Sequence, residues 1–220
     1  MRKVFVPLTI VVGLMFAYAP VMIANADYES TMGLVQKIFY FHAPSGMVML
    51  VSAIVCGLAS AWFLWRKDPE ADHIAFAAGE LTVLFGLILL VTGPLWARKA
   101  WGVWWQWDAR LTMSFLGWLT AVAYLLVRRF GGPGSDTLAA GVAVFGTANV
   151  PFIYVSVNIW RTVHPLTSVV PTLGPGMRGA FWFSALALFL LYSLLLTARV
   201  HLERRRATLD QLYLIEEDDR

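Results

Sequence analysis

The chain has 220 residues, of which 59% are hydrophobic and 14% charged, and its formal net charge is +3 at pH 7. Soluble domains are nearer half apolar and a quarter charged, and here the charges gather in short clusters between long apolar stretches. This pattern excludes a water-soluble protein, and so small a positive charge gives no reason to expect nucleic-acid binding. The single cysteine, Cys56, excludes an intramolecular disulfide and a cysteine-based metal site.

Six stretches are long and apolar enough to cross the hydrocarbon core of a bilayer, which takes about 20 residues. The sequence therefore predicts an all-α polytopic membrane protein with one integral membrane domain over residues 1–220. The predicted spans cover residues 4–24, 41–65, 75–96, 111–127, 137–160 and 179–198. A Trp-rich loop at 97–110 and a tail at 199–220 lie outside them.

The first span has two interpretations. Arg2 and Lys3, the apolar run after them and the sequence at 24–26 could form a signal peptide with its cleavage site. However, the apolar run is longer than the usual hydrophobic region of about 7–15 residues. We therefore interpret the segment as a retained helix.

The distribution of Lys and Arg predicts the orientation of the spans. With the N-terminus in the cytoplasm, the inner segments carry eleven of these residues and the outer segments six. This bias predicts that both termini are cytoplasmic. The outer segments nevertheless include a basic cluster at Arg98, Lys99 and Arg110, which opposes the bias and therefore indicates a function.

Polar residues within the spans have simpler explanations. Glu80 is close enough to the inner surface for its side chain to reach water. Asn149 and Asn158, with Pro151 between them, indicate a kink in the fifth span. Hydrogen bonds between helices would explain both asparagines without a substrate.

The loop after the third span is unusually rich in tryptophan, which occupies four of the seven positions 101–107. An aromatic belt at the membrane interface explains isolated tryptophans at span ends, but it needs no such density. In a helix, one face of this segment would carry Trp101, Trp104, Trp105 and Asp108. Such a face suits a large, flat, apolar ligand.

The charged residues around this segment allow more than one role. Arg98, Lys99 and Arg110 could contact lipid phosphates or pair with carboxylates of a ligand. Asp108 could cap the fourth span or pair with Arg110.

The chain contains four histidines, of which two lie on the predicted outer face. His73 and His201 lie at cytoplasmic span ends among charged residues, where we expect them to be solvated. His42 opens the second span and His164 follows the fifth, so both share the face of the Trp-rich loop. Neutral imidazole is the commonest protein ligand for metals. Two imidazoles, an aromatic platform and nearby cations together describe a haem site with both axial positions filled.

The run WGVWWQWDARLT at 101–112 resembles the WWD signature, WGxWWxWDxRLT, of haem-handling membrane proteins of cytochrome c biogenesis. CcmF-type members have many more spans and CcsA-type members are usually longer, so six spans in 220 residues are similar to the CcmC type. The resemblance covers nearly the whole chain. It implies a haem b site with axial ligands His42 and His164 and with further contacts from Trp101, Trp104, Trp105, Trp107, Asp108, Arg98 and Arg110.

The resemblance also implies a function and a set of partners. CcmC-type proteins hold haem at the outer face of the bacterial inner membrane and present it to a CcmE-type haem chaperone. They associate with a small CcmD-type membrane subunit and with CcmA- and CcmB-type subunits of an ABC transporter. We expect a carrier and not an enzyme, because the sequence shows neither a nucleophile–base pair nor a phosphate-binding loop.

Two other functions remain open at this point. A b-type electron-transfer cytochrome would also bind haem between histidines, but it usually buries them in the middle of helices. A small-solute transporter would need a polar site near the middle of the bilayer, where this sequence offers little beyond the asparagines around Pro151.

Overall fold

The computed structural model describes residues 2–29 and 32–218, and this part of the chain is helical without a β-strand. The α-helices are α1 (Arg2–Asn25), α2 (Phe39–Arg66), α3 (Pro69–Trp101), α4 (Ala109–Phe130), α5 (Ser135–Ala148), α6 (Val150–Ile159) and α7 (Pro175–Asp218). Two short 3-10 helices, η1 (Leu34–Ile38) and η2 (Thr167–Val169), precede α2 and α7.

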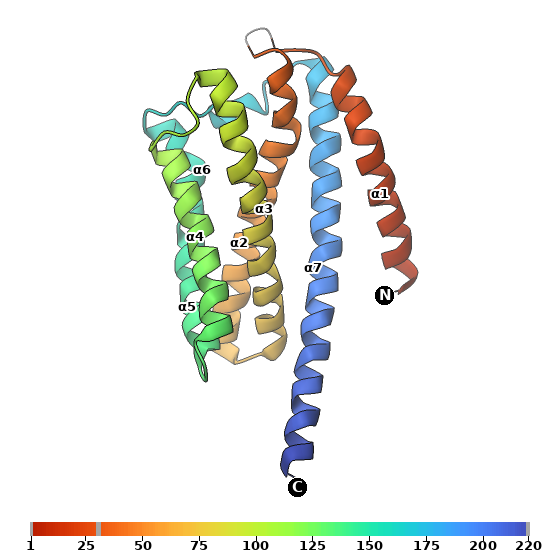
Figure 1. Ribbon diagram of the computed structural model, residues 1–220, viewed down its shortest axis with the longest axis vertical. Coiled ribbons are helices and arrows are strands. Elements are labelled where there is room, and N and C mark those ends of the chain that lie inside the picture. Colours follow the sequence, from red (N-terminus) through yellow and green to blue (C-terminus); the bar gives the residue numbers. More distant parts are fainter. Residues whose placement is uncertain (1, 30–31, 219–220) are drawn as a thin grey trace.

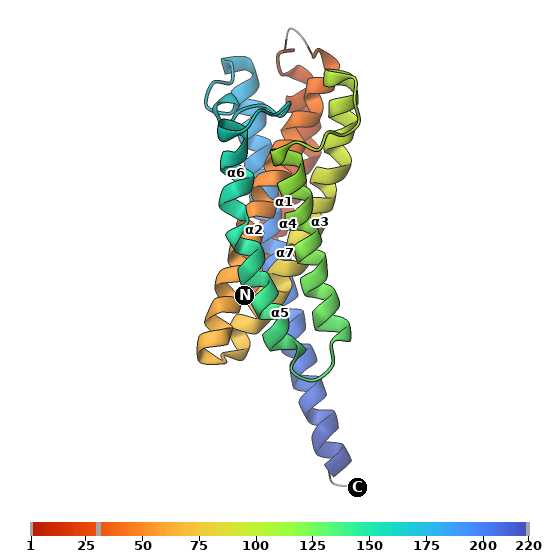
Figure 2. The same cartoon turned by 90° about the vertical axis from the view of Figure 1, so that its left-hand side faces the viewer.

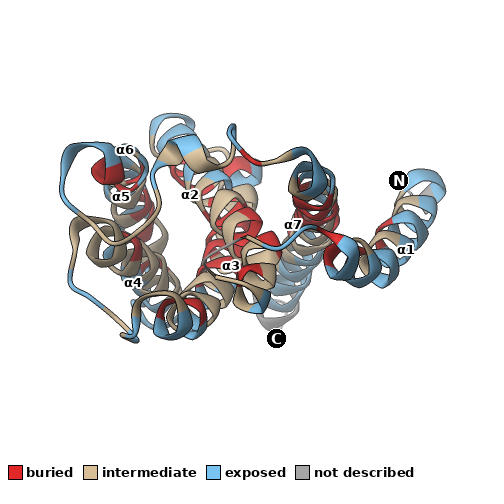
Figure 3. Ribbon diagram, turned by 90° about the horizontal axis from the view of Figure 1, so that it is seen from above, coloured by how far each residue is buried: buried red, intermediate tan, exposed pale blue. Residues whose placement is uncertain are grey.

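Six helical segments of the described residues are long and apolar enough to cross a membrane, with α5 and α6 together forming one of them. This confirms the prediction of an all-α polytopic membrane protein. Helices α2 and α3 lie in the middle of the bundle, between α4, α5 and α6 on one side and α7 and α1 on the other (Figures 1 and 3). The two chain ends point away from the end that carries the 102–108 and 160–174 connections (Figure 1).

Helix α7 is much longer than a span and extends beyond the bundle (Figures 1 and 2). The predicted tail at 199–220 is thus helical through Asp218, and its last two residues lie outside the described part of the chain. Arg199 is the first residue of this tail. Its Nε lies 2.6 Å from Oε2 of Glu80, and its Nη2 lies 2.8 Å from Oε1 of Glu203. Glu80 therefore has a structural partner that connects α3 to α7.

Small residues allow α2 and α5 to pack closely. The hydroxyl of Thr147 donates to the carbonyl oxygen of Ala53 at 2.9 Å, directly over Gly57. A Cβ atom added at Gly57 would overlap the Thr147 side chain, whereas one added at Gly141 would meet nothing within 4 Å. Close approach over small residues is a common way for membrane helices to associate.

This contact predicts opposite effects for two alanine substitutions. Gly57→Ala should destabilise the bundle by about 1–3 kcal/mol through overpacking. Gly141→Ala, the matched control in an open part of a helix, should be neutral or stabilise by about 0.5–1 kcal/mol. Thermal unfolding of both purified variants in detergent checks this. Equal stability of the two variants would contradict the packing described here.

The fifth span is broken between α5 and α6, as its asparagines and proline predict. Asn149 separates the two helices, and Pro151 follows within the first turn of α6. The side-chain amide of Asn149 donates to the carbonyl oxygen of Met113 in α4 at 3.1 Å. The break sets the direction of α6, which forms part of the site described next.

Candidate functional site

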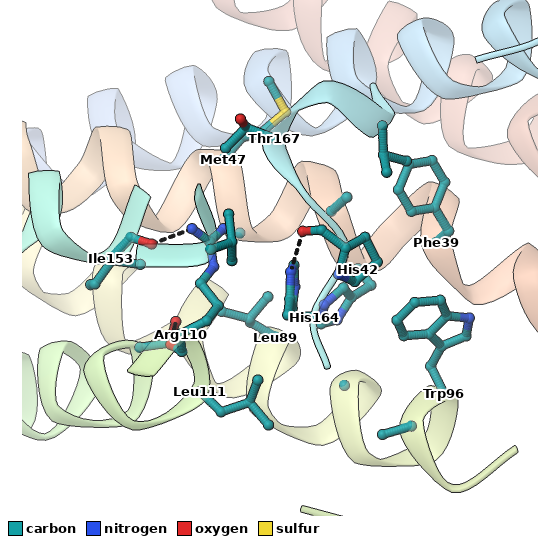
Figure 4. Close-up of a pocket in the computed structure, with 18 of the residues that line it drawn as sticks. Phe39, His42, Met47, Leu89, Trp96, Arg110, Leu111, Ile153, His164 and Thr167 are labelled. Carbon is teal, nitrogen blue, oxygen red and sulfur yellow. Dashed lines mark hydrogen bonds between the residues drawn. The ribbon is translucent and has the colours of Figure 1, made fainter. Parts of the chain in front are cut away.

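A cavity of about 390 Å³ lies at the end of the bundle that carries the 102–108 and 160–174 connections (Figure 4). Small-molecule sites usually measure about 300–1,000 Å³, so this volume is that of a ligand site. Helices α2, α3, α4 and α6 and both connections contribute to its wall. The predicted site residues in this wall are His42, Trp101, Trp104, Trp105, Arg110 and His164.

The Trp-rich segment reaches the cavity as a loop at 102–108, which is shorter than the predicted loop at 97–110, so its tryptophans do not share the face that a helix would give them. Helix α3 ends at Trp101 because Gly102, with a φ of 77°, adopts the left-handed conformation. Glycine accepts this conformation without strain and commonly terminates helices. The next residues are not helical until α4 begins after Asp108. The loop nevertheless places Trp104 and Trp105 in the same wall as Trp101.

Three predicted site residues lie outside the cavity wall that the described residues form: Arg98, Trp107 and Asp108. The Arg98 guanidinium donates to the carbonyl oxygen of Gly102 and thus closes the end of α3. Trp107 is 74% exposed, and its ring lies 5.7 Å from that of Trp105 between centroids. Trp107 therefore packs edge-to-face against a wall residue without lining the cavity itself.

Asp108 connects the Trp-rich loop to the loop that contains His164. Its Oδ1 accepts from the backbone N–H of Leu111 at 2.8 Å, which is the helix cap that the sequence suggests. Its Oδ2 accepts from the hydroxyl of Thr162 and from the N–H of Val163. The hydroxyl oxygen of Thr162 in turn accepts from the N–H of His164 at 3.0 Å. The Asp108 carboxylate thus caps α4 and also fixes the backbone just before His164, a candidate metal ligand.

The two histidines reach the cavity from different parts of the chain and are close enough to interact electrostatically (Figure 4). Nδ1 of His42 lies 2.9 Å from Oγ1 of Thr92, and Nδ1 of His164 lies 2.9 Å from the carbonyl oxygen of Pro165. Burial, assisted by the nearby Arg110 cation, lowers the pKa of His164 to about 4. The His164 imidazole is therefore neutral near pH 7, as a metal ligand must be.

Arg110 is the positive charge in the cavity wall. Its guanidinium donates to the carbonyl oxygen of Ile153 (Figure 4) and to that of Tyr154, both on α6. These bonds hold α4 against α6 and take the place of the suggested ion pair with Asp108. The remaining N–H groups of the guanidinium suit a carboxylate in the cavity.

Comparison with known proteins decides the family. The family model described as "Heme exporter protein C", or CcmC, matches residues 1–214. The chain belongs to the CcmC family. "Heme exporter protein C" of Bradyrhizobium diazoefficiens is 34% identical over 188 residues, which cover 84% of this chain and 70% of the relative.

Other members show the same extent of similarity to this CcmC-family chain. The protein of the same name from Escherichia coli strain K12 is 31% identical over 210 residues, covering 90% of the chain and 82% of the relative. The Haemophilus influenzae protein is 31% identical over 182 residues, which cover 76% of this chain and 72% of the relative. The resemblance based on the WWD signature is thereby confirmed.

Several residues of this CcmC-family site were not predicted from the sequence: Trp96 and Trp182 line the cavity, and Thr92 and Thr162 bond to its histidines. Thr92 lies fifty positions from His42, and a threonine within a helix usually bonds only to its own helix, so no local signal identifies it. Thr162, in contrast, has a local signal in the sequence. A threonine two residues before a histidine can accept the histidine's backbone N–H, as Thr162 does for His164.

Proposed function

We propose that this chain is a haem carrier that delivers haem for cytochrome c maturation. The observation that carries the proposal is one cavity lined by two imidazoles, five indoles and one guanidinium. Two imidazoles can fill both axial positions of a haem iron. Indole rings stack on a flat aromatic ligand, and a guanidinium pairs with a propionate. The residues present therefore fit haem.

The roles we assign follow the positions of the side chains. His42 and His164 are the axial ligands, and Arg110 is the partner of a haem propionate. Trp101, Trp104 and Trp105 contact the porphyrin. The three residues outside the wall act indirectly: Trp107 supports the aromatic wall, Asp108 holds the His164 loop, and Arg98 closes α3.

The cargo, which we take to be haem b, must also leave the site. Trp104 is in the wall yet 57% exposed, and Trp107 beside the wall is 74% exposed, so the aromatic edge is open to a partner. We propose that this edge meets a CcmE-type haem chaperone on the outer side of the bacterial inner membrane. The orientation rests on the distribution of Lys and Arg. CcmD-type and CcmA/CcmB-type subunits are the proposed assembly partners, and the protein itself performs no chemical step.

A transfer assay tests this function. The haem-loaded protein is mixed with a purified CcmE-type chaperone, and haem lost from the carrier is compared with haem bound covalently to the chaperone. A carrier should lose haem in step with the chaperone's gain. A b-type electron-transfer cytochrome should instead retain its haem and cycle it rapidly with quinol, and that result would overturn the proposal.

The connection through Asp108 gives a more specific prediction. In Asp108→Asn the side-chain oxygen can still cap α4, but the amide nitrogen cannot accept the bonds from Thr162 and Val163. Haem occupancy should fall several-fold, with a shift toward a high-spin spectrum, because His164 is no longer held in place. Thr162→Val should behave in the same way. Haem-to-protein ratios and absorption spectra of the purified variants measure the effect.

The control is a second capping aspartate at the other end of the bundle. Asp68 caps α3 by accepting from the N–H of Glu70 at 3.0 Å, far from the cavity. Asp68→Asn should keep the haem content of the parent protein. If Asp108→Asn and Thr162→Val also keep it, Asp108 is a helix cap and no more.

A further inference from the structure

The hydroxyl group of Thr92 on α3 lies between an acceptor and the ring of His42 on α2. Its Oγ1 is 2.7 Å from the carbonyl oxygen of Ile88 and 2.9 Å from Nδ1 of His42. A carbonyl oxygen only accepts, so the single hydroxyl proton of Thr92 is directed to Ile88. Oγ1 therefore presents a lone pair to His42, and Nδ1 of His42 carries the ring proton.

This arrangement determines which nitrogen of His42 can bind a metal. With the proton on Nδ1, the lone pair of the neutral ring is on Nε2. His164 has the same tautomer by a different route, because its Nδ1 lies 2.9 Å from the carbonyl oxygen of Pro165, which also only accepts. Both imidazoles are thus prepared to bind through Nε2.

The residue after Thr92 gives the ring of His42 its space. A Cβ atom added at Gly93 would lie 3.2 Å from Cε1 of His42, which is closer than ordinary van der Waals contact. The absence of a side chain at Gly93 lets the imidazole lie against α3, where Thr92 can reach it. Two consecutive residues of α3 therefore fix the position and the tautomer of a side chain on α2.

We propose that Thr92 is the positioning residue for His42: it accepts the Nδ1 proton and so directs Nε2 toward the haem iron. The inference rests on the proposed function, in which His42 is an axial ligand. A hydrogen bond to the far nitrogen of a metal-binding histidine orients the ring and makes it a stronger donor. Loss of such a partner typically weakens metal binding about 10- to 100-fold.

The test uses Thr92→Val, which keeps the shape of the side chain and removes the hydroxyl, and Thr92→Ser, which keeps the hydroxyl. Thr82→Val is the matched control, because Thr82 is a buried threonine of α3 whose hydroxyl donates to Ala78 at 2.9 Å. Haem affinity is measured by titration into the haem-free protein, and the midpoint potential by redox titration. Resonance Raman spectra of ferrous haem in a His164→Ala background report the iron–His42 bond.

Thr92→Val should weaken haem binding about 10-fold or more, raise the midpoint potential and lower the iron–histidine stretching frequency. Thr92→Ser should restore all three, and Thr82→Val should change none of them. If His42→Ala changes the parent spectrum but Thr92→Val leaves potential and frequency unchanged, the role of Thr92 is wrong and the proposed function stands. If His42→Ala leaves the parent spectrum unchanged, both are wrong.

Discussion

Replacing either His42 or His164 with alanine should convert a six-coordinate, low-spin haem into a five-coordinate or depleted form. Each substitution removes one axial ligand and leaves a space next to the iron that free imidazole can fill. Added imidazole should therefore restore the low-spin spectrum of each single variant. The double variant should retain almost no haem. Absorption spectra and haem-to-protein ratios, with and without imidazole, measure these effects.

The control for this experiment is a histidine far from the cavity. His73 lies near the start of α3, at the other end of the bundle, with Nδ1 3.9 Å from Oε1 of Glu70. His73→Ala should keep the parent spectrum. If His42→Ala and His164→Ala keep it too, the axial assignment is wrong, and Met47 in the wall of the same cavity is the next candidate.

Replacing Trp101, Trp104 and Trp105 together with leucine should nearly abolish haem binding. A stacked aromatic pair is worth about 0.5–1.5 kcal/mol beyond its buried area. Loss of one pair lowers affinity by about 10-fold or less, whereas loss of three lowers it by about 10-fold to more than 1,000-fold. Single substitutions should therefore reduce haem occupancy only modestly. Haem titration into each purified variant gives the comparison.

Two tryptophans far from the cavity serve as the control. They separate a specific effect of the cavity wall from the effect of losing aromatic residues in general. Trp62 and Trp65 lie toward the other end of α2 and pack against each other at 5.3 Å between ring centroids. Replacing both with leucine should leave haem affinity unchanged. Full haem loading of the triple variant at the Trp-rich loop would instead assign that motif to the aromatic belt of the membrane interface.

The transmembrane architecture could be predicted from the sequence because the bilayer imposes it. A chain must satisfy its backbone hydrogen bonds within each span, so six long apolar stretches become six helical crossings. The break in the fifth span was also predictable, since Pro151 removes a backbone donor and Asn149 precedes it. Each of these features depends on residues that are close together in the sequence.

Only the part of the site that depends on composition and local sequence pattern could be predicted. The tryptophan density and the two histidines predicted on the outer face identified residues that the fold brings into one cavity. The segment from Trp101 to Asp108 does not form one helical face, because a single residue, Gly102, ends α3 and turns the chain. The roles of Asp108 and Thr92 depend on partners 54 and 50 positions away, and no local pattern specifies such contacts.

The proposed site is defined above all by the axial ligand pair of the haem, which can be measured. Near-infrared magnetic circular dichroism of the ferric, haem-loaded protein distinguishes pairs of axial ligands by the energy of their charge-transfer band. The cavity that contains His42 and His164 predicts the band of two neutral imidazoles in a low-spin haem. A histidine–methionine band, or a high-spin spectrum in the unaltered protein, would show that His42 and His164 are not the axial pair.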